Sequence, residues 1–354
     1  MSLLKIGERE NKVDVVQGGM GVGISLSGLA GEVAREGGIG ILSAAQIGYR
    51  EPDYETDALK ANLRAVKSEL HKAKEYAPEG IIGMNIMVAT SDYEQYVRAA
   101  VEAKADLIVS GAGLPMELPK LVKDSGVKIA PIVSSLRSVR VITDYWWKKY
   151  RTLPDMVVIE GPEAGGHLGF HREELQKLLT GNPRENYDAF VQEIIGYIRE
   201  LEQKRQKKIP VVVGGGIYHR EEGEHYRKMG ADGVQLGTRF VTTYECDASM
   251  AYKKAYIDAR KEDIVIVDSP VGLPGRAIRN AFLERVSNGE RFFGSCRKCI
   301  RMCNPATSPY CIAQALIRAV EGDVSEGLLF CGAGAYQADH LEHVSDILRE
   351  FGEK

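Results

Sequence analysis

Residues 209–239 read IPVVVGGGIYHREEGEHYRKMGADGVQLGTR. The stretch contains two short runs of aliphatic, mostly β-branched residues, at 211–213 and 234–236, and glycines follow each run closely. Between them, residues 220–229 have the composition and periodicity of a helix. Strands that read as continuous apolar runs and alternate with helices pair in parallel, with both faces of the sheet covered. The stretch therefore predicts one strand-helix-strand unit of a parallel sheet.

The same alternation runs through the preceding part of the chain. Six earlier apolar runs lie at 13–16, 39–43, 82–86, 107–110, 129–133 and 156–159. Helix candidates lie between the runs at 57–76, 93–104 and 172–208, and we expect the last of these to be broken. Eight such units in about 240 residues are what a (β/α)8 barrel requires. We therefore predict an α/β fold, a (β/α)8 TIM barrel followed by a mostly helical C-terminal cap.

An open, doubly wound sheet is the alternative α/β architecture. Its nucleotide-binding form carries a G-x-G-x-x-G loop after the first strand. The first run here leads into QGGMGVG at 17–23, which does not have that spacing. The barrel is the stronger prediction.

The pattern changes after Phe240, where helical and irregular segments replace the strand rhythm. We expect a barrel at 1–245, a cap or lid at 246–325 and a C-terminal segment at 326–354 that packs back on the barrel. Within the lid, we expect one loop where residues that interrupt helices and strands cluster, namely Pro270, Gly272, Pro274 and Gly275. In the last segment, apolar residues recur at helical spacing, namely Leu341, Val344, Ile347 and Leu348.

Composition excludes several classes of protein. Hydrophobic residues make up 44% of the chain and charged residues 27%, which is typical of a globular protein with a large core. The net charge of -3 does not imply nucleic acid or an anionic membrane as a partner. We see no signal peptide and no apolar stretch long enough to span a bilayer. Six cysteines, four of them crowded together, do not resemble a disulfide-stapled secreted domain, so we expect a reducing cytoplasm.

Two glycine-rich loops predict a phosphate site. Residues 214–217 read GGGI after the seventh expected strand, and 235–239 read QLGTR after the eighth. In barrels of this kind these two loops often bind phosphate, because glycines let backbone N–H groups approach the anion. Thr238 adds a hydroxyl donor. A tight turn alone explains one glycine better than three in a row.

His167 is the candidate catalytic residue. It follows the sixth expected strand and has glycines on both sides of it in the sequence, in EGPEAGGHLG at 160–169. A histidine at the catalytic end of a barrel strand is placed to transfer protons near neutral pH. A hydrogen-bonded structural histidine is the alternative.

Together these motifs resemble a known family. The chain carries QGGM at 17–20, GMNI at 83–86, EAGGH at 163–167, GGGI at 214–217 and QLGT at 235–238. In this order they resemble nitronate monooxygenases, formerly called 2-nitropropane dioxygenases, and the pattern is shared with flavin-dependent enoyl-acyl-carrier-protein reductases. The resemblance covers residues 10–245 and, more loosely, GLLFCGAG at 327–334. It does not choose between the two activities.

The resemblance implies FMN as the cofactor and assigns roles to particular residues. Asn85 and the backbone of Gly18, Gly19 and Met20 would hold the flavin ring and ribityl chain. Glu160 would stand where the family places an acidic or amide side chain on FMN, and Gly165 would approach the cofactor through its backbone. His167 would be the catalytic base. The phosphate would be bound by Gly215, Gly216, Gly237 and Thr238, with Gln235 beside it.

A cysteine cluster lies outside the family pattern. Cys296, Cys299, Cys303 and Cys311 have spacings similar to thiolate sets that bind an iron–sulfur cluster or zinc. The alternative is that the first three share one face of a helix and pack as small core residues.

The functional hypothesis is FMN-dependent oxidation of alkyl nitronates with molecular oxygen. An NAD(P)H-dependent reductase of an enoyl thioester is the runner-up, and a non-catalytic flavin-binding barrel with redox-sensing cysteines is the third hypothesis. The expected partners are a small-molecule substrate and molecular oxygen, with a homodimer left open and with neither nucleic acid nor a membrane among them.

Overall fold

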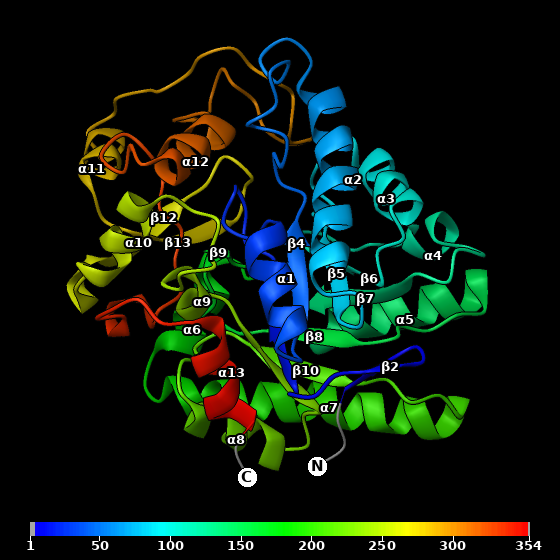
Figure 1. Cartoon of the computed structure of the whole chain (residues 1–354). Helices are drawn as coiled ribbons and strands as arrows, with labels where there is room; N and C mark the ends of the chain where they lie inside the picture. The colour runs from blue at the N-terminus through cyan, green and yellow to red at the C-terminus, as the bar shows by residue number, and fades with distance from the viewer. Residues whose placement is uncertain (1–3, 353–354) are drawn as a thin grey trace.

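A closed barrel of parallel strands forms the centre of the molecule (Figure 1). The computed structural model describes residues 4–352. Around the barrel the strands follow the order β10-β11-β3-β4-β5-β6-β7-β8, which confirms the predicted (β/α)8 fold. Their bounds are β3 Val15–Gln17, β4 Ile39–Ser43, β5 Ile81–Asn85, β6 Leu107–Ser110, β7 Lys128–Val133, β8 Val157–Glu160, β10 Val211–Gly214 and β11 Gly233–Leu236.

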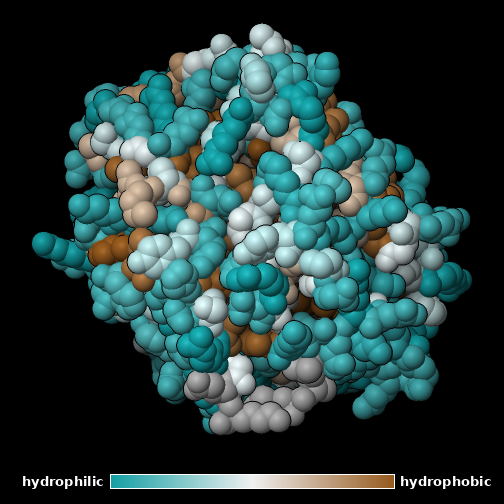
Figure 2. Space-filling model, in the orientation of Figure 1, coloured by the Kyte–Doolittle hydropathy of each residue, from teal (hydrophilic) through white to brown (hydrophobic). Residues whose placement is uncertain are grey.

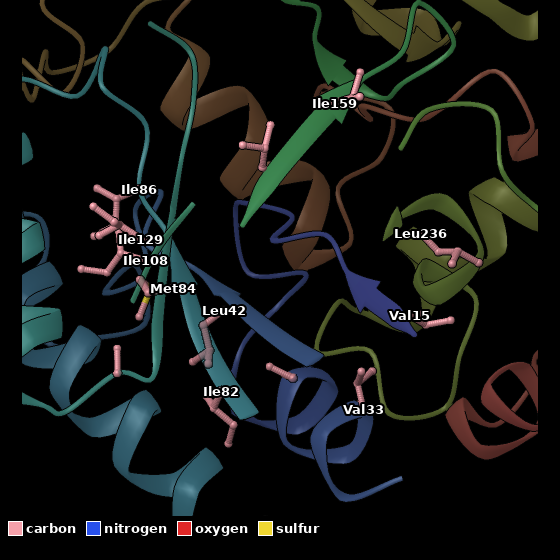
Figure 3. Close-up of a cluster of buried hydrophobic side chains, with 14 of the residues drawn as sticks. Val15, Val33, Leu42, Ile82, Met84, Ile86, Ile108, Ile129, Ile159 and Leu236 are labelled. Carbon is pink, nitrogen blue, oxygen red and sulfur yellow. The ribbon is translucent and has the colours of Figure 1, made fainter. Parts of the chain in front are cut away.

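The strands read as continuous apolar runs because both of their faces are buried. Val15 packs in the cluster between the sheet and the helices, whereas the next residue, Val16, packs in the separate cluster inside the barrel. Val211 and Val212 divide in the same way. Figure 3 shows part of the outer cluster, with side chains from several strands near Val33 of the first helix. Alternate residues thus fill two different cores.

Helices cover the outside of the barrel. The predicted break in the long helix after β8 is confirmed, since α6 ends at Leu179 and α7 begins at Pro183. Gly181 adopts a left-handed φ of 78°, and Asn182 accepts a hydrogen bond from Glu185 N as the N-cap. The helices are α1 Ser27–Arg35, α2 Ala58–Tyr76, α3 Tyr93–Glu102, α4 Leu118–Leu121, α5 Leu136–Tyr150, α6 Arg172–Leu179, α7 Pro183–Arg205, α8 Arg220–Lys228 and α9 Thr238–Val241.

The cap contains helices, as expected, and also a β-hairpin that we did not predict. Strands β12 (Ile264–Asp268) and β13 (Pro274–Ile278) pair in antiparallel fashion. The loop expected at 270–275 is therefore shorter, because its last two residues begin β13. β13 also pairs with β9 (Gly166–His167), so the cap extends a sheet from the loop after β8. The other cap elements are α10 Met250–Ile257, η1 Lys261–Asp263, α11 Ala281–Ser287 and α12 Ile312–Glu321.

The cysteine-rich segment, residues 288–311, has no helix. The interpretation of Cys296, Cys299 and Cys303 as one helical face is therefore wrong. Lys298 has a φ of 51°, in the left-handed region that a right-handed helix does not use. The segment arches across the top of the view from α11 (Figure 1), and Ile300 forms a bridge with Thr90, beyond β5.

The last helix, α13 (Val344–Gly352), lies against the barrel beyond the short turn η2 (Ala335–Gln337). Its buried side chains Val344, Ile347 and Phe351 belong to the same core as the barrel helices. A small hairpin of β1 (Lys5–Ile6) and β2 (Arg9–Glu10) lies at the other end of the chain. The division of the chain at 245 and 325 stays a prediction.

The visible surface is mainly hydrophilic. On the face drawn in Figure 2, hydrophobic residues show only in small, separate places. Among the described residues, no helix combines the length and the apolar character needed to cross a membrane.

Candidate active site

The carboxyl ends of the barrel strands and the cap enclose a cavity of about 270 Å³. The C-terminal face of the strands is where barrel enzymes place their active sites. Every residue that we predicted to bind the cofactor or act as the base lines this cavity, namely Gly18, Gly19, Met20, Asn85, Glu160, Gly165, His167, Gly215, Gly216, Gln235, Gly237 and Thr238. The structure thus brings the set together, and the individual roles stay predictions.

The cap supplies lining residues that the sequence did not reveal. They are Tyr256, Leu273, Leu316, Phe330 and Cys331. The last two lie in GLLFCGAG at 327–334, the tail segment that resembles the family, and this was the one signal that could have located them. The others are ordinary core residues by type.

His167 is held in strand β9 at the cavity wall. Gly275 of β13 is its partner in the ladder. The imidazole Nε2 forms a 2.8 Å hydrogen bond with Ser269 Oγ from the cap loop. The ring also stands edge-on to Phe330, with the two ring centroids 4.9 Å apart. Burial lowers the pKa of His167 to about 4, so the imidazole is neutral at pH 7 and can accept a proton.

Glu160 ends strand β8 and carries an unpaired carboxyl group. One of its oxygens, Oε2, accepts a 3.2 Å hydrogen bond from Gly169 N. Among the described ion pairs none includes Glu160. Burial without a cation raises the pKa of Glu160 to about 7. Near neutral pH a large share of this group is therefore protonated and able to donate a hydrogen bond into the cavity.

Glycines form much of the remaining wall. Gly215 and Gly216 have φ angles of 97° and 81°, which side chains rarely adopt. A Cβ at Gly19 would lie 2.5 Å from Asn85 Cβ, and a Cβ at Gly215 would lie 2.8 Å from Gly161 Cα. A Cβ at Gly237 would meet only Met20 within 4 Å, at 3.5 Å, so it would project into open space. Gly19 and Gly215 thus allow close backbone packing at the cavity wall, whereas a side chain at Gly237 would extend into open space. Such a wall of exposed backbone fits the flavin that the resemblance implies.

The phosphate end of this wall offers neutral donors. Thr238 Oγ1 accepts a 2.9 Å hydrogen bond from Gly332 N, which leaves the hydroxyl hydrogen free to donate. Among the described residues that line the cavity, none is Lys or Arg. A Cβ at Gly216 would clash with the Glu163 carboxyl group, so a bound phosphate would require the side chain of Glu163 to turn away. Backbone N–H groups would carry the binding.

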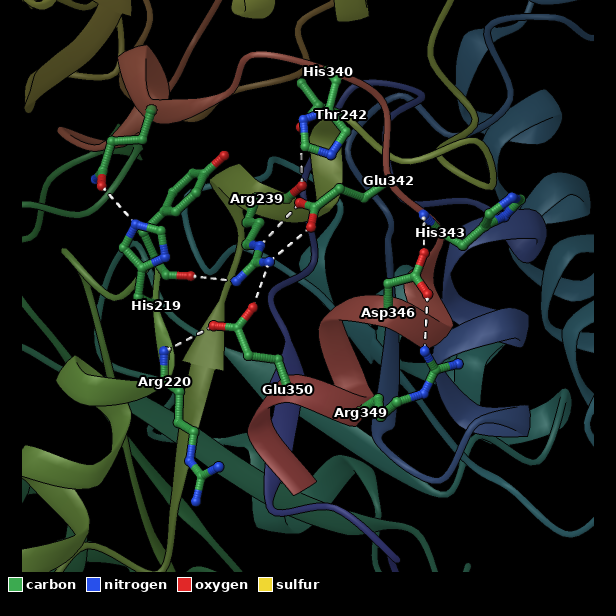
Figure 4. Close-up of polar contacts among 12 residues, drawn as sticks. His219, Arg220, Arg239, Thr242, His340, Glu342, His343, Asp346, Arg349 and Glu350 are labelled. Atoms are coloured by element: carbon green, nitrogen blue, oxygen red, sulfur yellow. Dashed lines mark hydrogen bonds and ion pairs between the residues drawn. The ribbon is translucent and has the colours of Figure 1, made fainter. Parts of the chain in front are cut away.

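The arginine that follows Thr238, Arg239, is not among the residues that line the cavity, and Figure 4 shows its guanidinium directed at Glu342 and Glu350. The buried guanidinium of Arg239 donates 3.0 and 2.7 Å hydrogen bonds to the Glu342 carboxylate and a 3.0 Å bond to Tyr218 O. A second carboxylate, that of Glu350, lies 2.7 Å from Nη2. This cation therefore joins the C-terminal segment to the barrel.

Arg276 in β13 is also diverted from the cavity. The residue is 4% exposed and its guanidinium donates to two carbonyl oxygens of the loop after β8, Pro162 O at 2.9 Å and Ala164 O. Burial lowers its pKa. Arg276 thus anchors the cap to the loop that carries His167.

The four clustered cysteines do not converge as metal ligands. Cys296 is exposed, while Cys299, Cys303 and Cys311 are half-buried. No group of three or more Cys, His, Asp or Glu side chains within residues 4–352 is arranged to hold a metal ion. Burial, and next the nearby thiols of the other three cysteines, raise the pKa of Cys299 to about 12 in the absence of a metal. The predicted zinc or iron–sulfur site is therefore not supported.

Comparison with known proteins identifies relatives over nearly the whole chain. A family model described as nitronate monooxygenase matches residues 5–353. A probable nitronate monooxygenase from Staphylococcus saprophyticus is 25% identical over 298 residues, which cover 78% of each chain. Two solved structures share the fold with a TM-score of 0.70 and cover 96% of this chain. FabK from Thermotoga maritima is 24% identical with 92% of it covered, and a nitroalkane oxidase from Streptomyces ansochromogenes is 19% identical with 95% covered.

Proposed function

The chain belongs to the nitronate monooxygenase family of oxidoreductases, and we propose that it uses FMN to oxidise alkyl nitronates, or their parent nitroalkanes, with molecular oxygen. The observation that carries this proposal is the neutral imidazole of His167, held at the wall of a glycine-lined cavity. A base that stays uncharged at pH 7 suits the removal of a proton from carbon.

The cavity residues divide between the cofactor and the substrate. Gly215, Gly216, Gly237 and Thr238 would hold the phosphate, with Gln235 beside it, and Asn85 would help to hold the flavin ring. When bound, FMN supplies the electron chemistry of the oxidation, while the protein supplies binding and orientation. Glu160 in its protonated form would donate a hydrogen bond to the ligand.

His167 would move the proton. Its Nε2 bonds to Ser269 Oγ, so Nδ1 accepts the proton from the substrate carbon in the tautomer that places a hydrogen on Nε2. Ser269 thereby holds the ring orientation, and its hydroxyl would accept a hydrogen bond from Nε2 in this tautomer. The hairpin β12–β13, paired with β9, and Phe330 against the imidazole exclude water from one side of this group.

The enoyl thioester reductase is the weaker alternative. Such an enzyme must also hold the phosphate of a reduced nicotinamide nucleotide. Arg276, which lies in β13 just after the cap loop, is a candidate cation for that phosphate. The guanidinium of Arg276 is instead buried against two backbone carbonyls. The described lining of the cavity offers no other cation.

The test is anaerobic mixing of the purified yellow enzyme with propyl nitronate, or with NADH or NADPH. We expect propyl nitronate to change the visible spectrum of the flavin rapidly and the nucleotides to act slowly or not at all. Fast bleaching by a nucleotide, reversed by a crotonyl thioester, together with no response to nitronates, would establish the reductase instead.

A further inference from the structure

One wall of the cavity is apolar, and the barrel, the cap and the C-terminal segment all contribute to it. Phe330, Met87 and Leu316 belong to one hydrophobic cluster and all three face the cavity. Leu273 lies on the cap loop that also carries Ser269, the hydrogen-bond partner of His167. Apolar side chains therefore lie near His167, where they could contact the hydrocarbon chain of a bound nitronate.

The described residues that line this cavity include two glutamates but no lysine or arginine. Among the described lining residues, the acidic and basic side chains are those of Glu160, Glu163 and His167; Tyr218, Tyr256 and Cys331 also line the cavity, and burial raises the pKa of each. Two arginines lie close in sequence to cavity residues but bind elsewhere. Arg239 binds the carboxylates of Glu342 and Glu350, and Arg276 donates to backbone carbonyl oxygens. A negative substituent on the substrate would find no cation here.

We propose that this cavity selects nitronates with an uncharged hydrocarbon chain and rejects those that carry a carboxylate, such as propionate 3-nitronate. The inference rests on the proposed function and adds the substrate class to it. An alkyl nitronate is polar only at its nitro group, and His167, held by Ser269, would meet that end. The rest of the chain meets Phe330, Leu273, Leu316 and Met87.

The size of the selection follows from burial. Each methylene buried contributes roughly 0.8 kcal/mol, or about a fourfold gain in kcat/KM from ethyl to propyl to butyl nitronate. A carboxylate buried without a partner is strongly unfavourable, so we expect kcat/KM for propionate 3-nitronate to be about 100-fold or more below that for butyl nitronate. The two compounds have similar length and the same reacting group.

A charge introduced at the wall should reverse the preference. Leu273 is half-buried at the cap loop, where the long stem of a lysine can lie along apolar surface with its ammonium at the cavity. We expect Leu273→Lys to raise kcat/KM for propionate 3-nitronate about tenfold and to lower it for butyl nitronate. Leu273→Met changes the shape without the charge, and its ratio between the two substrates should stay as in the wild type.

Binding is measured separately from turnover, by titrating the visible spectrum of the bound flavin with 1-nitrobutane and with 3-nitropropionate. Tighter binding of 1-nitrobutane, weakened preference in Leu273→Lys and an intact flavin signal in both variants support the inference. Equal binding of the two compounds, or a preference for the carboxylate, overturns it. A failure of the proposed function would look different, since no nitronate would then be turned over while the binding titration still decides the charge selection.

Discussion

Two buried arginines, Arg239 and Arg297, lie in regions of opposite character. At the junction between barrel and C-terminal segment, the side chain of Arg239 is 7% exposed and bonds to Glu342, Glu350 and Tyr218 O. In the cysteine-rich segment, the side chain of Arg297 is 9% exposed, yet its one carboxylate partner, Glu55, is 73% exposed. The Nε and Nη1 atoms of Arg297 are buried without a hydrogen-bond partner.

The two arginines differ in how completely their hydrogen-bond donors are satisfied. At the barrel junction every polar group has a partner, and the local rules of strand, helix and turn agree with the tertiary packing. In segment 288–311 the chain lacks regular structure and a buried cation is only partly satisfied. The cavity is a third case, in which Glu160 has one donor and its second oxygen is available for a ligand.

The largest effect is expected from Arg239→Ala. The change leaves Glu342 and Glu350 without their common partner in a largely buried network, and breaking such pairs typically costs about 3–5 kcal/mol. Arg297→Ala is the matched control and should cost about 1 kcal/mol or less, because its partner Glu55 is solvated. Urea unfolding of both variants measures the difference. Equal losses would remove the contrast between the two regions.

Glu160 should make stability depend on pH in a recognisable direction. Burial raises its pKa to about 7, whereas a glutamate in an unfolded chain titrates near about 4.3. Between these values the folded protein binds more protons, so the free energy of unfolding falls as the pH rises through this window, by up to about 4 kcal/mol.

Glu160→Gln removes this titration while keeping a similar shape. The variant should therefore lose less stability than the wild type between pH 5 and pH 8, as measured by urea unfolding at each pH. Glu55→Gln, on the exposed partner of Arg297, should follow the wild-type curve. A Glu160→Gln curve parallel to that of the wild type would mean that the carboxyl group is ionised throughout.

His167→Ala should keep the flavin and lose activity on a neutral nitroalkane by about 100-fold, the usual scale for a general base. The loss on a pre-ionised nitronate should be smaller, because no proton has to be removed. Met302→Ala, on a residue of segment 288–311 that is 82% exposed, is the control and should leave activity unchanged.

The pH profile of kcat/KM sharpens this assignment. Burial lowers the pKa of His167 to about 4, so the imidazole is neutral at all higher pH values. The rate on a nitroalkane should therefore persist below the ordinary histidine range and fall only near pH 4. A decline centred on about pH 6.5, the ordinary value, would mean that the base is exposed to solvent.

The barrel could be predicted because its signals are local. Runs such as 211–213, the glycines after them and the helix between them follow from residue type and periodicity within about 30 residues. His167 and the glycine loops were found for the same reason, since the barrel itself places strand ends on one face. Glu160 was assigned through the family resemblance.

The cap could not be predicted to the same depth because its contacts are distant in sequence. Ser269 reaches His167 across 102 positions, and Phe330 meets the same ring from the tail segment. Neither residue type signals an active site by itself. The strand at 264–268, IVIVD, was not predicted, and its pairing with β13, and of β13 with β9, depends on register that periodicity does not give.

The smallest effects are expected from substitution or chemical modification of the cysteines, four of which lie in segment 288–311. In the folded protein a thiol reagent should modify Cys296 first, since it is exposed. Cys299 should react slowly, because mainly its burial raises its pKa to about 12 and leaves little thiolate. Cys246 and Cys331 are buried and should react only on unfolding.

Metal analysis of the same anaerobic preparation completes this test. Thiolate ligation would protect Cys296, Cys299, Cys303 and Cys311 together, and a chelator would release them together, because a metal site is lost as a unit. Graded reactivity is expected instead, since the four thiols differ in exposure and do not converge. Cys296→Ser should then remove the fast phase alone and leave stability within about 0.5 kcal/mol of the wild type, as for most surface changes. Zinc or iron at a fixed ratio to protein, with all four thiols protected, would show that segment 288–311 is organised around a metal.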